Sequence, residues 1–319
     1  MQYGNIDGID KPISRLVHGT MMLNSEEEAW SFELLDAVYE RGVTAFDTGH
    51  LYGGGDCERV LGRWMKDRGV RDKMVILGKG AHHNADRRRV TPYDITADLH
   101  DSLVRFQVDH IDIYVLHRDD PSLPVGPIVD ILNEHIKAGK IGIIGGSNWS
   151  HERIQEANEY AAVNGLQPFS VSSPNFSLAE QTEPPWAECI TISGPENAEV
   201  RAWYQESQMP LFTWSSIANG FFSGRLTRAN FEEVKDQFDE SSIRAYCTPA
   251  NFDRLDRAEK LAADKGLSVA QVALAYVLNQ PLNIYALVGA RSPAECEANL
   301  QALELELITE EMDWLDLRD

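Results

Sequence analysis

Four polar side chains follow apolar, strand-like runs in the first half of the chain and could together act as a proton donor. Asp47 ends the run VTAFD, Lys79 follows MVILG, His117 follows IDIYVL, and Tyr52 lies five residues beyond Asp47. A tyrosine hydroxyl donates its proton poorly at neutral pH unless a nearby cation stabilises the phenolate, and Lys79 could be that cation. A buried lysine in turn needs a carboxylate partner, which Asp47 could provide. If His117 orients a substrate oxygen, the set predicts general acid–base chemistry at Tyr52.

Each of these residues taken alone is also compatible with a structural role. A lone aspartate at a strand end often caps a helix, a lone lysine is usually solvated, and a lone histidine is often a hydrogen-bonded structural residue. The catalytic interpretation therefore depends on a fold that brings the side chains together.

Short β-rich runs alternate with longer amphipathic stretches, which indicates a parallel sheet covered by helices. We expect strands at 15–19, 43–47, 74–78, 111–115, 141–145, 169–173, 210–213 and 284–288. One helical pattern spans 25–42, with Ser25 and Glu28 as a capping box and Gly42 as its stop, and another begins at Thr91 and Pro92. Eight strand–helix units predict an α/β fold, a closed (β/α)8 TIM barrel with its active site at the C-terminal ends of the strands.

The remaining segments are expected to decorate this barrel. The opening stretch YGNIDGIDKP predicts a hairpin that caps the bottom of the barrel. Segments 174–194 and 225–266, the second with a charged helix after Asn251, read as loops and additions near the C-terminal half. We therefore predict a single domain over residues 1–319.

Composition excludes several classes of protein. The formal net charge of -21 disfavours nucleic acid and anionic membranes as partners. Four scattered cysteines without a C-x-x-C pair give no sign of a zinc site or a disulfide framework. The N-terminus has no basic start followed by an apolar run, and no segment reaches the length of a membrane span. We expect a cytoplasmic enzyme that acts on a small molecule.

The motifs resemble those of the aldo-keto reductase family, in family order from about residue 15 to 305. The family pattern of an aspartate, a Tyr-Gly pair, further glycines and a glutamate is matched by Asp47, Tyr52, Gly53, Gly55 and Glu58. Lys79 in ILGKG, His117 in DIYVLHRDDP, GGSNW at 145–149 and GARSPAECEANLQAL at 289–303 match later segments. The resemblance implies NAD- or NADP-dependent interconversion of a carbonyl and its alcohol by hydride transfer, with Tyr52, Lys79, Asp47 and His117 as the catalytic residues.

The resemblance also implies a nucleotide site. Ser147, Asn148 and Ser173 correspond to residues that bind the nicotinamide carboxamide, and Trp214 to the aromatic ring stacked on the nicotinamide. Ser215, Ile217 and Gly220 correspond to the pyrophosphate loop, and Arg291, Glu295 and Asn299 to the adenosine end. Core packing is the alternative for Trp214. Ser173 stands where many relatives have glutamine. Glu295 favours a free 2'-hydroxyl, as in NAD, whereas Arg291 favours NADP, so the preference stays open.

Polar and cationic residues near the strand ends are candidates for a substrate pocket, and they favour a hydroxyl-rich or anionic substrate such as a sugar. The candidates are His18, Met21, Met22, His50, His82, His83, Arg118 and Trp149. His82 and His83 could equally form a solvated loop pair.

Two other functions stay open. One is a metal-dependent hydrolase or isomerase on the same barrel, with ligands from His50, His82, His83, His117 and Asp119, although no metal site is expected because no H-x-H pair lies on a strand. The other is a non-catalytic, cofactor-sensing subunit.

Overall fold

The computed structural model describes residues 1–318 and contains eight parallel strands in a closed barrel. The barrel strands are β3 (Leu16–Gly19), β4 (Ala45–Asp47), β5 (Val75–Gly80), β6 (Ile111–Leu116), β7 (Ile141–Ser147), β8 (Phe169–Ser173), β9 (Leu211–Thr213) and β10 (Ile284–Val288). All eight predicted strands are present, and the predicted (β/α)8 fold class is confirmed. The strands are apolar along most of their length because both faces are buried.

Contacts along the chain group the residues into two compact units. Unit 1 holds Met1–Ser173 with Gly289–Pro293, and unit 2 holds Pro174–Val288 with the rest of the described chain. The single-domain organisation stays a prediction.

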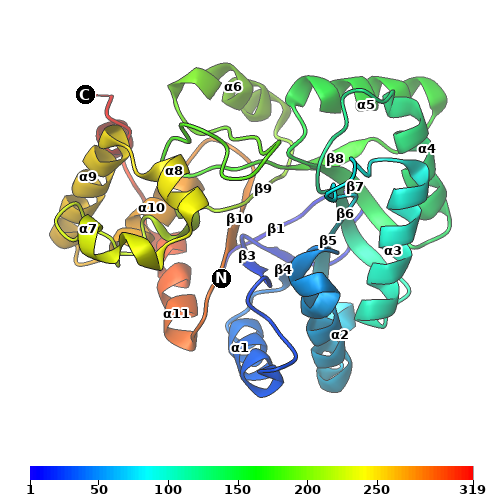
Figure 1. The fold of residues 1–319 in the computed structure, drawn as a ribbon, viewed down its shortest axis with the longest axis horizontal. Coiled ribbons are helices and arrows are strands. Elements are labelled where there is room, and N and C mark those ends of the chain that lie inside the picture. Colours follow the sequence, from blue (N-terminus) through cyan, green and yellow to red (C-terminus); the bar gives the residue numbers. More distant parts are fainter. Residues whose placement is uncertain (319) are drawn as a thin grey trace. The chain divides into compact units, whose positions relative to one another are not determined.

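In unit 1, five helices flank strands β3–β8 (Figure 1). They are α1 (Glu28–Glu40), α2 (Asp56–Arg68), α3 (Pro92–Phe106), α4 (Val125–Lys137) and α5 (His151–Asn164). The strands pair in parallel, with Gly19 opposite Asp47, Asp47 opposite Leu77, and Lys79 opposite Val115. This register carries the C-terminal ends of β4, β5 and β6 to one edge.

Of the two helix starts predicted in unit 1, one is correct and the other is wrong. Helix α3 begins at Pro92, as the sequence predicted, and the Thr91 side chain accepts a hydrogen bond from the backbone N–H of Asp94. The capping box at Ser25 is wrong, because α1 begins at Glu28 with no side-chain cap. Ser25 instead donates its backbone N–H and its hydroxyl to the carboxylate of Asp56, 2.6 and 2.5 Å away, at the start of α2.

The N-terminal hairpin lies at the bottom of the barrel, as predicted. Strands β1 (Tyr3–Gly4) and β2 (Ile13–Ser14) pair antiparallel. Lys11 Nζ donates to the carbonyl of Met74, 2.8 Å away, and to Asp112 Oδ1, 2.6 Å away. Met74 precedes β5 and Asp112 lies near the start of β6, so the hairpin is attached to the N-terminal ends of the strands.

Unit 2 holds β9 and β10, which pair in parallel, and most of the remaining helices. These are α6 (Ala198–Ser207), α7 (Phe231–Val234), α8 (Glu240–Tyr246), α9 (Pro249–Lys265), α10 (Val269–Leu278), α11 (Pro293–Gln301) and α12 (Thr309–Leu315). The charged helix expected after Asn251 is α9, which starts two residues earlier because Thr248 caps it. In segment 174–194, Asn175 forms an isolated bridge with Thr191.

Candidate active site

The catalytic candidates lie at or beyond the C-terminal ends of three neighbouring strands of unit 1. Asp47 is the last residue of β4, Lys79 lies in β5, and His117 follows β6. Strand β5 extends to Gly80, so Lys79 belongs to the strand rather than to the loop after it. Tyr52 opens a 3-10 turn, Tyr52–Gly55, that leads into α2.

The Lys79 ammonium lies between the carboxylate of Asp47 and the hydroxyl of Tyr52. Its Nζ lies 2.6 Å from Asp47 Oδ1 and 3.4 Å from the hydroxyl of Tyr52. The ring of His117 stands edge-on to that of Tyr52, with centroids 5.6 Å apart. Lys79 is 2% exposed, Asp47 4% and His117 8%. The fold therefore brings the four predicted side chains into one cluster, in which Tyr52 is half-buried and the other three are buried.

Burial and charge set the protonation states of this cluster. Burial alone would lower the pKa of Lys79, but the charge of Asp47 and the contact with Tyr52 outweigh it and raise that pKa, so Lys79 is a cation at neutral pH. Burial raises the pKa of Asp47 against the pull of Lys79. Burial also raises the pKa of Tyr52, and Lys79 lowers it by less. Lys79 thus acts on Tyr52 in the expected direction, but the hydroxyl stays protonated at neutral pH.

His117 is a neutral imidazole at neutral pH. Burial, with the positive charges of Lys79 and Arg118, holds its pKa well below the usual value. A neutral ring carries one N–H, so it can donate one hydrogen bond to an oxygen without adding a charge.

The turn that carries Tyr52 depends on glycine and on a buried ion pair. Gly55 has a φ of +88°, and a Cβ there would lie 2.4 Å from Cζ of Arg105. Arg105 donates to the carbonyl of His50, 2.8 Å away, and to Glu58 Oε2, 2.9 Å away. Glu58 is fully buried and also accepts from the Ser102 hydroxyl at 2.7 Å. Sequence reasoning missed Arg105 and Ser102, although Glu58 lies within the motif that it used.

The predicted pocket residues occupy different surroundings. The ring of His82 lies 4.9 Å from that of His117, and Arg118 donates to the carbonyl of His117, 2.8 Å away. His50 points to α3, where its Nε2 lies 3.1 Å from Asp101 Oδ2. His18 and Trp149 are buried, whereas Met21 is exposed.

Ser147, Asn148 and Ser173 lie together in unit 1, at the ends of β7 and β8. The Ser147 hydroxyl and the Asn148 backbone N–H both donate to the carbonyl of Ser173, at 3.0 and 3.2 Å. The Ser173 hydroxyl is buried and has no hydrogen-bond partner within residues 1–318. A buried, unsatisfied hydroxyl fits a polar group of a ligand such as a carboxamide.

In unit 2, the segment that follows β9 has an unusual backbone. Ser215, Ala218, Asn219 and Gly220 all have positive φ, between 50° and 88°. Successive N–H groups in such conformations can form an anion-binding concavity. The ring of Trp214 lies 5.9 Å from that of Trp186, and its buried Nε1 finds no acceptor in the part of the chain that the structure describes. This segment therefore fits an aromatic, phosphate-bearing ligand.

The three residues predicted for the adenosine end lie at or within α11. Glu295 is exposed in the first turn of this helix, Asn299 is half-buried near its end, and Arg291 is exposed two residues before it.

Neither a metal centre nor a single-helix membrane span is found within residues 1–318. No group of three or more His, Cys, Asp or Glu side chains is placed to hold a metal ion. No single helix there is long and apolar enough to cross a membrane, and one pair, α9 with α10, passes only when joined across a 102° bend.

Comparisons with known proteins agree with the resemblance in the motifs. The sequence profile of the Aldo/keto reductase family matches residues 15–317. An aldo-keto reductase of Bacillus subtilis (strain 168) is 28% identical over 93% of this chain and 87% of its own length. An aryl-alcohol dehydrogenase of Pestalotiopsis microspora is 27% identical over 90% of this chain and 71% of its own. A solved structure of a thermostable aldo-keto reductase in complex with epalrestat superposes with a TM-score of 0.75 at 22% identity, covering both chains fully.

The profile match covers nearly the whole chain, and the structural match supports the barrel independently of close sequence identity. The chain belongs to the aldo/keto reductase family, and it is an NAD(P)H-dependent oxidoreductase.

Proposed function

We propose that the protein interconverts a small carbonyl compound and its alcohol with Tyr52 as general acid and base, while a bound NAD(P)H or NAD(P)+ supplies or accepts the hydride. The observation that carries this proposal is the position of Lys79 Nζ, 2.6 Å from Asp47 Oδ1 and 3.4 Å from the Tyr52 hydroxyl. A cation held this way by a buried carboxylate stabilises a phenolate more than it stabilises the neutral phenol.

In the reductive direction, Tyr52 donates its proton to the substrate oxygen as that oxygen gains negative charge. Lys79 stabilises the phenolate that remains, and Asp47 holds Lys79 in place and charged. Neutral His117 donates a hydrogen bond to the same oxygen, and this bond strengthens as the charge develops. In the oxidative direction, the Tyr52 phenolate accepts the proton of the alcohol.

For the nucleotide, we assign the carboxamide to Ser147, Asn148 and Ser173. The unsatisfied, buried hydroxyl of Ser173 supports this assignment. The carbonyl of Ser173 already accepts two hydrogen bonds from Ser147 and Asn148, which fixes the orientation of all three residues before a ligand arrives.

In unit 2, we assign the nicotinamide-stacking ring to Trp214 and the pyrophosphate to the backbone of Ser215, Ile217 and Gly220. The left-handed conformations in this segment support a phosphate loop. Arg291, Glu295 and Asn299 are assigned to the adenosine end, where Glu295 would favour the free 2'-hydroxyl of NAD and Arg291 the 2'-phosphate of NADP.

The proposed substrate is hydroxyl-rich or anionic, such as a sugar derivative. The clustering of His82 and Arg118 beside His117 supports it, because each of these residues can donate to a hydroxyl or an anionic oxygen. The relative named as an aryl-alcohol dehydrogenase favours the alternative of an aromatic alcohol. A panel of sugars and benzylic compounds separates the two, and efficient turnover of the apolar members alone overturns the sugar proposal.

The experiment that tests the mechanism uses Tyr52→Phe, which removes only the hydroxyl. We expect loss of carbonyl-dependent NADPH or NADH oxidation, while quenching of tryptophan fluorescence by the same nucleotides is retained. Retained turnover would exclude Tyr52 as the proton donor. Binding without turnover in the wild-type protein, over a broad carbonyl panel, would instead favour the cofactor-sensing subunit.

A further inference from the structure

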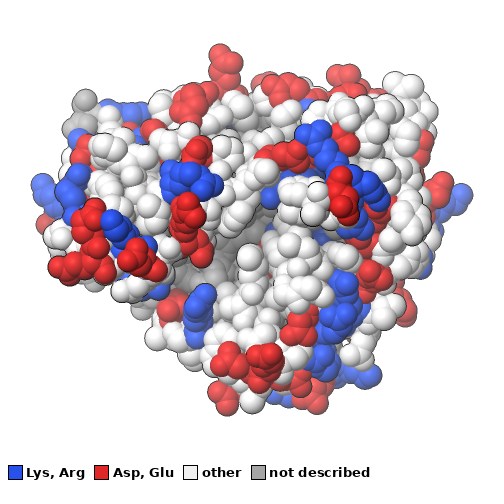
Figure 2. All heavy atoms as spheres, in the orientation of Figure 1, with Lys and Arg blue, Asp and Glu red and all other residues white. Residues whose placement is uncertain are grey.

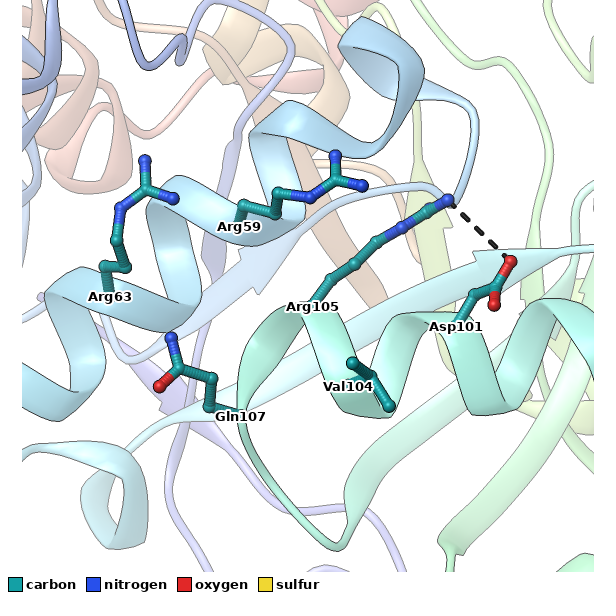
Figure 3. Close-up of a pocket in the computed structure, with 6 residues that line it drawn as sticks. All are labelled: Arg59, Arg63, Asp101, Val104, Arg105 and Gln107. Atoms are coloured by element: carbon teal, nitrogen blue, oxygen red, sulfur yellow. Dashed lines mark ion pairs between the residues drawn. The ribbon is translucent and has the colours of Figure 1, made fainter.

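A groove with basic walls lies at the surface of unit 1, between helices α2 and α3. Its volume is about 640 Å³, and it is lined by Arg59, Arg63, Asp101, Val104, Arg105 and Gln107. Figure 3 shows Arg59 and Arg63 extending from α2, and Arg105 from α3 beside Asp101. This volume falls within the range of about 300–1,000 Å³ that is typical of small-molecule sites.

Helix α2 presents a row of cations to this groove. Arg59, Arg63 and Lys66 follow one another at spacings of four and three residues, which places them on one face of the helix. Lys66 does not itself line the groove, but its Nζ donates to the side chain of Gln107, which does, 2.9 Å away. Figure 2 shows basic side chains gathered where Figure 1 has α2. This concentration contrasts with the net charge of -21 of the whole chain.

Most side-chain N–H donors of Arg59 make no hydrogen bond within residues 1–318. Its guanidinium is exposed and makes one long hydrogen bond, 3.4 Å, to the carbonyl of Gly54, and it has no ion pair within the described part of the chain. Arg63, by contrast, is paired with Glu28. Beside these arginines Val104 leaves 76% of its side chain exposed, so the groove also offers an apolar contact.

Arg105 forms a fixed wall of the groove. The fully buried Glu58 and the carbonyl of His50 hold its Nη1 at 2.9 and 2.8 Å. Its Nη2 lies 3.8 Å from Asp101, whose side chain is 60% exposed, so this pair is long and solvent-screened. The Arg105 side chain is 15% exposed, so its guanidinium reaches the groove while Nη1 stays fixed, and a guanidinium held in this way is suited to binding phosphate.

We propose that this groove binds a compact anion with at least two phosphate groups, with Arg59 and Arg105 as its direct ligands and with Arg63 and Lys66 adding to the positive field. None of these residues belongs to the catalytic cluster or to the proposed nucleotide-binding set. The site is therefore additional to the carbonyl–alcohol reaction, although Arg105 also holds the turn that carries Tyr52.

The test is isothermal titration calorimetry of the full chain with inorganic pyrophosphate at low ionic strength, with and without saturating NADPH. With NADPH occupying the nucleotide site, we expect saturable binding of pyrophosphate at one remaining site, with affinity about tenfold weaker in Arg59→Gln. Because Arg59 makes no ion pair within residues 1–318, the variant should remain folded, and thermal unfolding should confirm this. Arg228→Gln is the matched control, because Arg228 is an exposed arginine of unit 2 paired with Asp253 and Asp256.

The proposal would be overturned by absence of saturable binding in the presence of NADPH, by equal affinity of the wild type and Arg59→Gln, or by equal losses in Arg59→Gln and Arg228→Gln. Complete displacement of pyrophosphate by NADPH would also overturn it, because the ion would then occupy the nucleotide site. Binding is measured directly, so the outcome does not depend on whether the protein turns over a carbonyl substrate.

Discussion

Replacing Lys79 with methionine tests the electrostatic basis of the mechanism. Methionine retains an unbranched side chain but removes the cation that lies 3.4 Å from the Tyr52 hydroxyl. At an effective dielectric constant of about 20, two unit charges at this distance interact by about 5 kcal/mol, which is an upper bound. Asp47, 2.6 Å from the same nitrogen, cancels part of this field. A charge-assisted hydrogen bond contributes about 1.5–3 kcal/mol, so we expect the rate of alcohol oxidation to fall about 10- to 100-fold.

The pH profile of alcohol oxidation distinguishes an electrostatic role of Lys79 from a purely structural one. Loss of Lys79 disfavours the phenolate, so the rising limb of the profile should move to higher pH. Lys79→Met also leaves Asp47 buried without a partner, which costs about 3–5 kcal/mol of stability. The double variant Asp47→Asn with Lys79→Met removes that charge and should recover stability but not rate. An unmoved pH limb, or full recovery of rate in the double variant, would refute the role of Lys79.

Two further predictions follow from buried groups of unit 1. Burial lowers the pKa of His18 from 6.5 to about 4, so the unfolded chain binds the proton more readily and stability is lost as pH falls from about 6.5 towards 4. Denaturant unfolding at several pH values should show this loss, up to about 3 kcal/mol, in the wild type and not in His18→Leu; parallel curves would contradict it. Arg105→Met should lower kcat about 10- to 100-fold with little change in KM or nucleotide affinity, because it frees the backbone at His50 and Gly55 that places Tyr52. Partial rescue by Arg105→Lys would support positioning, whereas a matched rise in KM would argue against it.

The strands and the clustering of the candidate catalytic side chains could be predicted because their signals are local. Buried parallel strands form short apolar runs that stand out between amphipathic helices, and all eight were located. The polar residue at or after such a run falls at the active-site end of a barrel, so the sequence alone predicts that Asp47, Lys79 and His117 lie near one another. Thr91 caps α3 within its own segment, so that helix start was also readable.

The errors and omissions arise from contacts between distant segments. Serine is a common N-cap residue, but the hydroxyl and the backbone N–H of Ser25 both donate to the carboxylate of Asp56, 31 residues away. In the sequence, Arg105 and Ser102 are typical polar residues of an amphipathic helix. Their role follows only from the packing of α3 against α2, where both donate hydrogen bonds to Glu58. The pKa of Tyr52 likewise depends on how deeply its hydroxyl is buried and how close Lys79 lies to it, and the spacing of residues in the sequence does not predict either.

The hairpin at the bottom of the barrel bears on the order of events during synthesis. Lys11 leaves the ribosome 101 residues before its partner Asp112. Asp112 also accepts the backbone N–H of Ile76, at 2.9 Å, and pairs with Arg71, so one carboxylate joins three segments. At translation rates of about 5–20 residues per second, Asp112 is synthesised about 5–20 seconds after Lys11, so the contact between the hairpin and β6 cannot form sooner. A chain stalled before β6 should therefore leave its first residues open to proteases, and the same residues should become protected once Asp112 has left the exit tunnel.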